Sequence, residues 1–235
     1  MISRTSASFS ASATVVRLFQ SSGIGRNSKQ SKVNERSVFS DTVKAQRAEE
    51  GSSASSDKEQ KARDHIDLRV GKVLRASVHA EADKLYVEEI DLNESNGPRT
   101  ICSGLVPFMK ASEIEGKNVI VVANLKARNM QGVKSHGMIL AASNDAHDYV
   151  ELLVAPDDAV LGSRVMFGDV KFVGEPSSEN QVQKKKRWED FGPMLITNEK
   201  SEGTWKEDGS VMKVLLESGE YGSITCKSLT NATIG

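Results

Sequence analysis

The chain has 235 residues, of which 38% are hydrophobic and 27% are charged, and its formal net charge at pH 7 is −1. This length allows one or two domains with real cores and excludes a large multidomain enzyme. No stretch approaches the roughly 18 apolar residues that a membrane span requires, so we expect no membrane partner. Cys102 and Cys226 lie far apart, with no Cys or His at metal-ligand spacing, so we expect neither a disulfide framework nor a metal site.

Residues 1–40 have the composition of an organellar transit peptide. The first 34 residues contain nine Ser, three Arg and two Lys, and no acidic residue precedes Glu35. We therefore expect a mitochondrial or plastid location, and the composition does not choose between the two organelles. An ordinary disordered tail, with a cytoplasmic location, is the alternative. Residues 41–63 are polar and rich in serine, which predicts a disordered linker.

Alternating apolar residues predict the first strands of a domain that spans residues 64–169. A strand from residue 68 should bury the residues of one parity, which are Leu68, Val70, Leu74, Ala76 and Val78. Residues 84–92 predict a second strand, in which the apolar positions change phase between Val87 and Ile90. A β-bulge would cause such a change.

Three further strands and one helix complete the predicted domain. Turn residues at 93–98 precede a strand at 99–103, the spacing at 106–116 predicts a short helix, and strands follow at 118–125 and 138–142. The fold class is therefore all-β, and five strands with one small helix are typical of an OB-fold barrel. A sandwich or another small barrel fits the same pattern.

Residues 170–235 predict a small C-terminal β-rich domain. Apolar segments at 149–154 and 165–172 come before a polar boundary at 175–183, and strands are then expected at 194–197, 211–216 and 224–229. About 50 residues are too few for confident independent stability. We therefore expect this unit to pack on the barrel.

Charge is unevenly distributed along the chain. Residues 64–169 carry 11 Lys and Arg against 16 Asp and Glu, which argues against indiscriminate binding of polyanions. Residues 124–138 are the exception, because Lys126, Arg128 and Lys134 lie in a stretch, 116–144, without any acidic residue. Such a window attracts phosphates. The nearby polar side chains suited to ribose or base edges are Asn124, Asn129, Gln131, Ser135 and His136. These residues alone favour RNA binding and an ordinary solvated hairpin equally.

Five motifs in order resemble a known family. They are DLRVGKV (67–73), ADKLY (82–86), ICSGL (101–105), IVVANLK (120–126) and MQGVKSHGMILAAS (130–143). The chain resembles the tRNA-binding domain of bacterial structure-specific tRNA-binding proteins, of C-terminal extensions of some methionyl- and tyrosyl-tRNA synthetases, and of endothelial monocyte-activating polypeptide. The likeness covers residues 64–169, and residues 184–191 and 225–235 resemble the extra domain of the eukaryotic branch.

The resemblance implies an OB-fold that recognises the outer corner of folded tRNA by shape, not by anticodon sequence. Bacterial members are homodimers, whereas the extra domain of the eukaryotic branch imitates the second subunit. The resemblance therefore implies a monomeric pseudo-dimer. The position after Lys126 is often proline in relatives and is Ala127 here, so no proline ring fixes the backbone of this loop.

Combining the charge window with these motifs gives a candidate site. The expected tRNA-binding residues are Lys84, Arg99, Ser103, Asn124, Lys126, Arg128, Met130, Lys134, Ser135, His136 and Met138. Auxiliary phosphate contacts are expected from Lys184, Lys185, Lys186 and Arg187, although a run of lysines is usually a solvated face. No histidine has a nearby nucleophile in a catalytic arrangement, so we expect no catalytic residue.

The expected function is non-catalytic tRNA binding by an auxiliary factor that delivers tRNA to an aminoacyl-tRNA synthetase or retains it there. The glycines at 23–25 are not followed by a phosphate-loop element, and synthetase signatures are absent, so we expect neither a cofactor nor aminoacylation by this chain. A scaffold of a synthetase complex and a cytokine-like polypeptide are the alternatives. The sequence identifies neither the preferred tRNAs nor the synthetase.

Overall fold

The computed structural model describes residues 63–169 and 174–235. The predicted transit peptide and nearly all of the predicted linker lie outside the described residues. Both described ranges belong to one compact unit. Within these ranges, no helix has the length and apolar character needed to cross a membrane.

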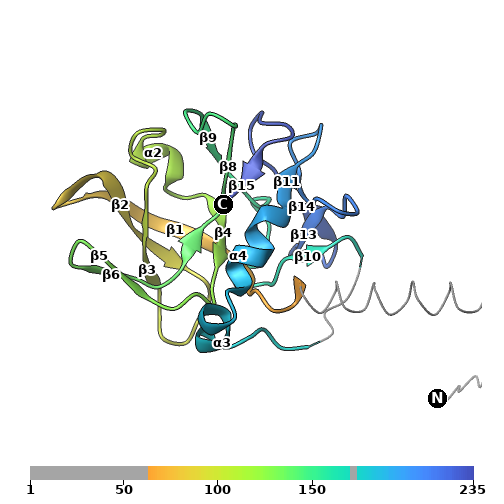
Figure 1. The fold of residues 1–235 in the computed structure, drawn as a ribbon, viewed down its shortest axis with the longest axis horizontal. Helices are drawn as coiled ribbons and strands as arrows, with labels where there is room; N and C mark the ends of the chain where they lie inside the picture. Colours follow the sequence, from red (N-terminus) through yellow and green to blue (C-terminus); the bar gives the residue numbers. More distant parts are fainter. Residues whose placement is uncertain (1–62, 170–173) are drawn as a thin grey trace, which may run out of the picture. The chain divides into compact units, whose positions relative to one another are not determined.

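One curled antiparallel sheet organises the first half of the structure (Figure 1). Its strands are β1 (Leu68–His79), β2 (Ala82–Asp91), β3 (Arg99–Ser103), β4 (Asn118–Val122) and β7 (Met138–Ile139), in the order β3-β2-β1-β4-β7. β7 also contacts β3, which brings the two edges of the sheet together. The short helix α2 (Ala111–Ile114) lies between β3 and β4 in sequence. The predicted all-β, barrel-like fold with one small helix is confirmed.

A β-bulge lies in β1, opposite Glu89 and Ile90, and not within β2 between Val87 and Ile90, so its predicted position was wrong. Val73 pairs with Ile90 and Arg75 pairs with Glu89, which leaves Leu74 as the extra residue. The bulge turns the following part of the strand, and Leu74 is 50% exposed. Val78, which the simple alternation also placed in the core, is 55% exposed.

In β2, buried and less buried residues alternate regularly from Tyr86 to Asp91, and one of the buried positions is occupied by a glutamate. Tyr86, Glu88 and Ile90 are all buried on the same face, and Val87 is only partly buried. The apparent change of phase in the sequence came from this polar residue in the barrel interior. Hydropathy alone could not place it there, since a carboxylate is rarely buried without a partner.

The cationic segment forms a β-hairpin. β5 (Arg128–Met130) and β6 (Val133–Ser135) pair across a two-residue turn. The turn residues Gln131 and Gly132 have φ values of +50° and +92°. Positive φ at both positions is the geometry of a type I′ turn, whose twist suits a tight hairpin.

The strands after residue 174 join sheets that also contain strands from before residue 170. The remaining elements are β8 (Ala141–Ser143), β9 (Val150–Leu152), β10 (Met166–Phe167), α3 (Glu179–Lys184), α4 (Arg187–Phe191), the 3₁₀ turn η1 (Gly192–Met194), β11 (Leu195–Thr197), β12 (Gly203–Trp205), β13 (Met212–Leu215), β14 (Tyr221–Ser223) and β15 (Thr233–Ile234). One sheet has the order β12-β11-β15-β8-β9, and another has the order β10-β13-β14. The expected packing of this segment on the barrel is therefore observed.

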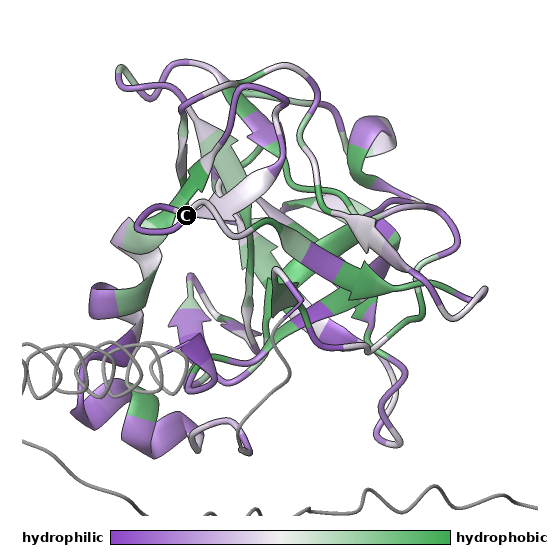
Figure 2. Cartoon of the chain, turned by 90° about the vertical axis from the view of Figure 1, so that its right-hand side faces the viewer, coloured by the Kyte–Doolittle hydropathy of each residue, from purple (hydrophilic) through white to green (hydrophobic). Residues whose placement is uncertain are grey.

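A shared core supports this arrangement. One hydrophobic cluster joins barrel residues such as Val70 and Ile120 to C-terminal residues such as Trp205 and Met212, while a second cluster fills the barrel around Ile90. Hydrophobic colouring accordingly follows the strands at the centre of the unit, and α3 is mostly hydrophilic (Figure 2). The boundary between two domains at residue 170 stays a prediction.

Local structure in the C-terminal segment differs from its prediction in two ways. Residues 224–229 are not a strand: β14 ends at Ser223, and Thr225 forms only isolated bridges with Val154 and Glu202. Residues 179–191 contain two short helices that were not predicted. The first begins with a capping signature, because the Ser178 N–H donates to Gln181 Oε1 at 3.3 Å.

Candidate nucleic-acid interface

A groove of about 600 Å³ opens between β3, the β5–β6 hairpin, β7 and β15. Six of the eleven residues expected to bind tRNA line it: Ser103, Lys126, Arg128, Met130, Ser135 and Met138. Ser103 ends β3 and the other five come from residues 126–138, and the fold brings these two stretches together. The other five, Lys84, Arg99, Asn124, Lys134 and His136, lie outside it.

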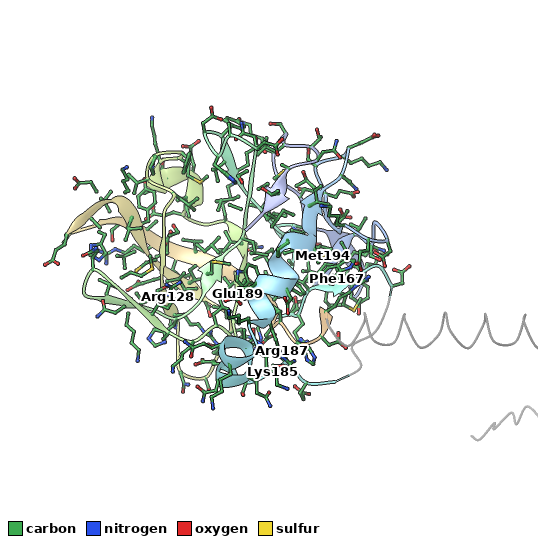
Figure 3. All side chains as sticks on the ribbon, viewed as in Figure 1. Arg128, Phe167, Lys185, Arg187, Glu189 and Met194 are labelled. Carbon is green, nitrogen blue, oxygen red and sulfur yellow. The ribbon has the colours of Figure 1, made fainter. Side chains whose placement is uncertain are left out.

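The hairpin separates the predicted cations onto two faces. Arg128 pairs with Ser135 and Met130 pairs with Val133, so these four side chains share the face next to the groove. Lys134 pairs with Asn129 and points to the opposite face. The position of Arg128 on this hairpin is labelled in Figure 3.

Cationic groups at the groove and near it are available to a ligand. Lys126, Arg128 and Lys134 are exposed, and none of them belongs to the ion pairs found among residues 63–169 and 174–235. Lys84 is also exposed, near the start of β2. An unpaired exposed cation can exchange its counterions for a phosphate without first breaking an internal contact.

One of the groove residues, Ser103, has a hydroxyl that is hydrogen-bonded to a buried carboxyl group. Ser103 Oγ donates a hydrogen bond to Glu88 Oε1, and Glu88 is fully buried. Burial raises the pKa of Glu88 to about 7, although the hydrogen bond from Ser103 acts in the opposite direction. Glu88 Oε2 has no hydrogen-bond partner in the described part of the chain. The ionisation of Glu88 therefore determines whether Ser103 must donate inward.

Asn124 has a structural position. Its Oδ1 accepts from the Asp67 N–H at 2.9 Å, and its Nδ2 donates to the carbonyl oxygens of His65 and Ser177, each at 2.9 Å. The side chain is buried. Asn124 thus joins the loop after β4 to the segment before β1 and to the segment before α3. Its predicted contact with RNA would require these hydrogen bonds to open.

Ser135 is likewise used inside the protein. Its Oγ accepts from the Cys102 N–H at 3.0 Å and donates to the Gly137 carbonyl at 3.1 Å. Gly137 itself packs closely on β3 and β4: a Cβ at this position would lie 3.0 Å from Ile101 Cδ1 and 3.1 Å from the Val122 carbonyl oxygen, so a larger residue would not fit without a shift. These contacts fix the hairpin against β3.

Arg99 is a clamp and not a free cation. Its Nε and Nη2 donate to the two carboxylate oxygens of Glu94, each at 2.7 Å. Its Nη1 donates to the carbonyls of Ala123 at 2.6 Å and His136 at 3.0 Å. Hydrogen bonding from Arg99 lowers the pKa of Glu94, so the pair remains ionised. The exposed His136 is therefore held at its backbone by Arg99.

His79 supports the hairpin, a role that its isolation in the sequence did not reveal. Its Nδ1 accepts from the Glu81 N–H at 3.0 Å, so the proton of the neutral ring lies on Nε2. Nε2 is 3.1 Å from the carbonyl oxygen of Met130 and donates to it. The tip of β1 is thereby joined to β5.

The predicted auxiliary cations lie on and after α3. Lys184, Lys185 and Lys186 are exposed, whereas Arg187 is partly buried and its Nη1 donates to Ser177 Oγ at 2.5 Å. Figure 3 labels Lys185 and Arg187 at this end of α3, apart from the label of Arg128. A depression of about 390 Å³ is lined by Arg99, His136 and Glu179, so α3 begins beside the clamp.

Several groove residues were missed by sequence reasoning. They are Phe108, His147 and Thr233, which come from the turn before α2, the turn before β9 and β15. No local signal identifies them, because they share a surface only after β15 pairs with β8.

Comparisons with known proteins connect the chain with a family of tRNA-binding domains. A family model described as "Putative tRNA binding domain" matches residues 68–164. The chain is 45% identical over 133 residues to "Probable methionine--tRNA ligase" of Oryza sativa subsp. japonica. The aligned segment covers 57% of this chain and 16% of that protein. It is 33% identical over 173 residues to "tRNA-aminoacylation cofactor arc1" of Schizosaccharomyces pombe, which covers 72% and 37%, respectively. The chain thus spans well under half the length of these two relatives.

A solved structure resembles a larger share of the fold. The C-terminal domain of Plasmodium vivax p43 aligns with a TM-score of 0.63 at 31% sequence identity. The alignment covers 73% of this chain and 98% of that one. It therefore extends beyond the residues that the family model matches.

Proposed function

The chain belongs to the tRNA-binding domain family, and from this premise we propose that it binds folded tRNA and holds it for an aminoacyl-tRNA synthetase, without catalysing a reaction itself. The observation that carries this proposal is the pair of exposed cations, Lys126 and Arg128, on the groove that Ser103, Met130 and Met138 also line. Phosphates would meet the cations while a ribose or base meets the groove.

Recognition by shape is supported by the internal hydrogen bonds of the polar side chains near the groove. Arg99, Asn124 and Ser135 could read base edges, but their polar atoms are engaged in the internal bonds described above. The free groups are mainly charges, which contact backbone and carry little sequence information. The domain should therefore discriminate weakly among tRNA sequences and strongly against RNA without the folded shape.

Salt-dependent binding tests this proposal. The parent chain should bind folded tRNA with an affinity that falls steeply as salt rises, and Lys126→Ala or Arg128→Ala should reduce the magnitude of the log-salt slope by about 0.7 to 0.9 each. Lys206→Ala, which removes an exposed charge outside the groove, is the matched control and should leave the slope unchanged. Equal affinity for an unstructured RNA of the same length would contradict recognition by shape.

An auxiliary role beside a synthetase is supported by the relatives, one of which is itself a methionine–tRNA ligase and another an aminoacylation cofactor. The chain should co-purify from cells with tRNA and with a synthetase. If the synthetase remains bound after RNase treatment, a direct contact between the proteins exists, as the scaffold alternative requires. If it is lost, tRNA is the link.

We further propose that the barrel is an OB-fold and that the chain is a monomeric pseudo-dimer. β1 pairs with both β2 and β4, and β7 returns to β3, as closure of a small barrel requires. Strands β11 and β15 cover positions beside β8 that a second subunit could otherwise occupy. Light scattering after gel filtration should give the mass of a single chain, and a dimer would refute the pseudo-dimer proposal.

The location in an organelle is a separate proposal that depends on the composition of residues 1–40. Removing residues 1–40 should move a fluorescent fusion from mitochondria or plastids to the cytosol. An unchanged location would refute it.

A further inference from the structure

A further depression, of about 400 Å³, adjoins the groove, and we name it the aromatic hollow. Phe108 and Val150 line both the groove and the aromatic hollow, so the two form one continuous surface. Tyr149 lines the aromatic hollow only. The charged residues that line the aromatic hollow are Lys117, Lys227, Glu113 and Glu151.

The aromatic hollow presents rings that the core does not use. Phe108 is 38% exposed and Tyr149 is 50% exposed. Neither belongs to the two hydrophobic clusters found among the described residues, whereas Val150 packs against one of them. Both aromatic side chains thus leave a part of their apolar surface in water, side by side on one hollow.

Hydrogen bonds hold the backbone that carries both rings. The Phe108 N–H donates to the Leu105 carbonyl at 3.0 Å, within the turn that leads to α2. The Tyr149 N–H donates to Asn144 Oδ1 at 3.1 Å, and the Asn144 N–H donates back to the Tyr149 carbonyl at 3.2 Å. Rings on such fixed turns lose little freedom when a flat ligand stacks on them.

The charged residues around the aromatic hollow can contact a nucleic acid, but they contribute little net attraction for it. Lys117 and Lys227 are exposed, and no ion pair joins either to a carboxylate in the described ranges. Glu151 is already engaged by the Ser228 N–H and Oγ–H, each at 2.7 Å, and by the Leu229 N–H. Two cations against two carboxylates cannot draw a polyanion strongly, so the rings must provide most of the attraction.

We propose that Phe108 and Tyr149 stack unpaired bases of the RNA whose backbone is held at Lys126 and Arg128. This inference rests on the proposed function and extends its footprint from phosphates to unstacked bases. Every base has a π-face, so stacking tolerates any sequence and agrees with recognition by shape. The ligand is therefore a folded RNA that carries an unpaired segment beside the bound backbone.

Ring-removing and ring-keeping variants test the inference. Phe108→Ala and Tyr149→Ala should each weaken tRNA binding by roughly 5- to 100-fold, the effect of losing one stacked base, with the log-salt slope unchanged. Tyr149→Phe keeps the ring and should bind like the parent, whereas Phe108→Leu keeps apolar bulk without a π-face and should lose affinity. Tyr221→Ala removes a ring that is 51% exposed on β14, outside both hollows, and should have no effect.

A blunt RNA duplex provides the discriminating ligand, because it offers no unpaired base. Its binding should be equal for all of these variants. If Phe108→Ala and Tyr149→Ala bind tRNA like the parent while Lys126→Ala weakens binding, the inference is overturned and the proposed function stands. Equal losses on tRNA and duplex also overturn stacking. A parent chain that does not bind tRNA overturns both proposals.

Discussion

The guanidinium carbon of Arg63 lies 4.8 Å from the ring centre of Trp205. Arg63 is buried, also lies 5.8 Å from the ring centre of Phe167, and its Nη2 is 2.7 Å from Asp208 Oδ2. The first described residue of the chain thus lies over the rings of Phe167 on β10 and Trp205 on β12, which contact each other edge to face. A planar cation is suited to this position, because it can stack on both rings while donating to a carboxylate.

Arg63→Ala should lower the free energy of unfolding by about 2 to 4 kcal/mol, since it removes a buried cation and leaves a space above the two rings. Arg63→Lys keeps the charge but not the planar group, and should recover only part of the loss. Urea denaturation followed by tryptophan fluorescence measures both. A parent-like midpoint for Arg63→Ala would show that this contact does not stabilise the fold.

Glu88 should make stability depend on pH. Its pKa is raised by burial from 4.5 to about 7 in the folded chain, so the folded state binds more protons than the unfolded state between these values. The free energy of unfolding should therefore fall as pH rises through this window, by up to about 3 kcal/mol. Glu88→Gln should match the parent near pH 4 and be more stable at pH 8. The exposed neighbour Glu89→Gln is the control and should follow the parent; identical profiles for all three would exclude the effect.

His79→Ala should loosen the hairpin while leaving every groove cation in place. Losing the hydrogen bond to the Met130 carbonyl removes about 1 kcal/mol, so tRNA affinity should fall by up to about 5-fold. Amide exchange of residues 133–135 should become faster in the same variant. Unchanged exchange would show that β3 alone holds the hairpin.

Asn124→Ala should affect stability more than recognition. It leaves the Asp67 N–H and the His65 and Ser177 carbonyls without their buried partner, which should cost about 2 to 4 kcal/mol. The exposed Asn129→Ala is the matched control and should change stability by about 0.5 kcal/mol. Thermal unfolding measures the stability of both. A stable Asn124→Ala chain with lost tRNA binding would instead favour the direct contact predicted from the sequence.

The two faces of the hairpin should differ in their effect on binding. Arg128 lines the groove and Lys134 points to the other face, so Arg128→Ala should reduce tRNA affinity and the salt slope more than Lys134→Ala does. Arg128→Lys should retain the slope, because one charge remains. A larger effect of Lys134→Ala would move the RNA to the opposite face.

Local pattern was enough to identify the barrel strands β1 to β4, the small helix α2 and the cationic segment. Apolar patterning marked these strands, because β1 and β2 bury alternate residues over part of their length and all five residues of β4 are buried. The absence of acidic residues around Lys126 and Arg128 marked the segment that lies at the groove. These signals are local in the chain, and a sequence records them directly.

Only the tertiary structure decided which polar residues are free. Arg99, Asn124 and Ser135 resemble ligand-binding residues in the sequence, yet each is engaged by partners that include residues at least 24 positions away. Glu88 looked like a break in the pattern and is a buried inward residue of an unbroken strand. Hydrogen bonds across a folded sheet depend on register and closure, which no local spacing encodes. The sequence by itself therefore determined the strands and the charge, and the fold decided which of those side chains a ligand can reach.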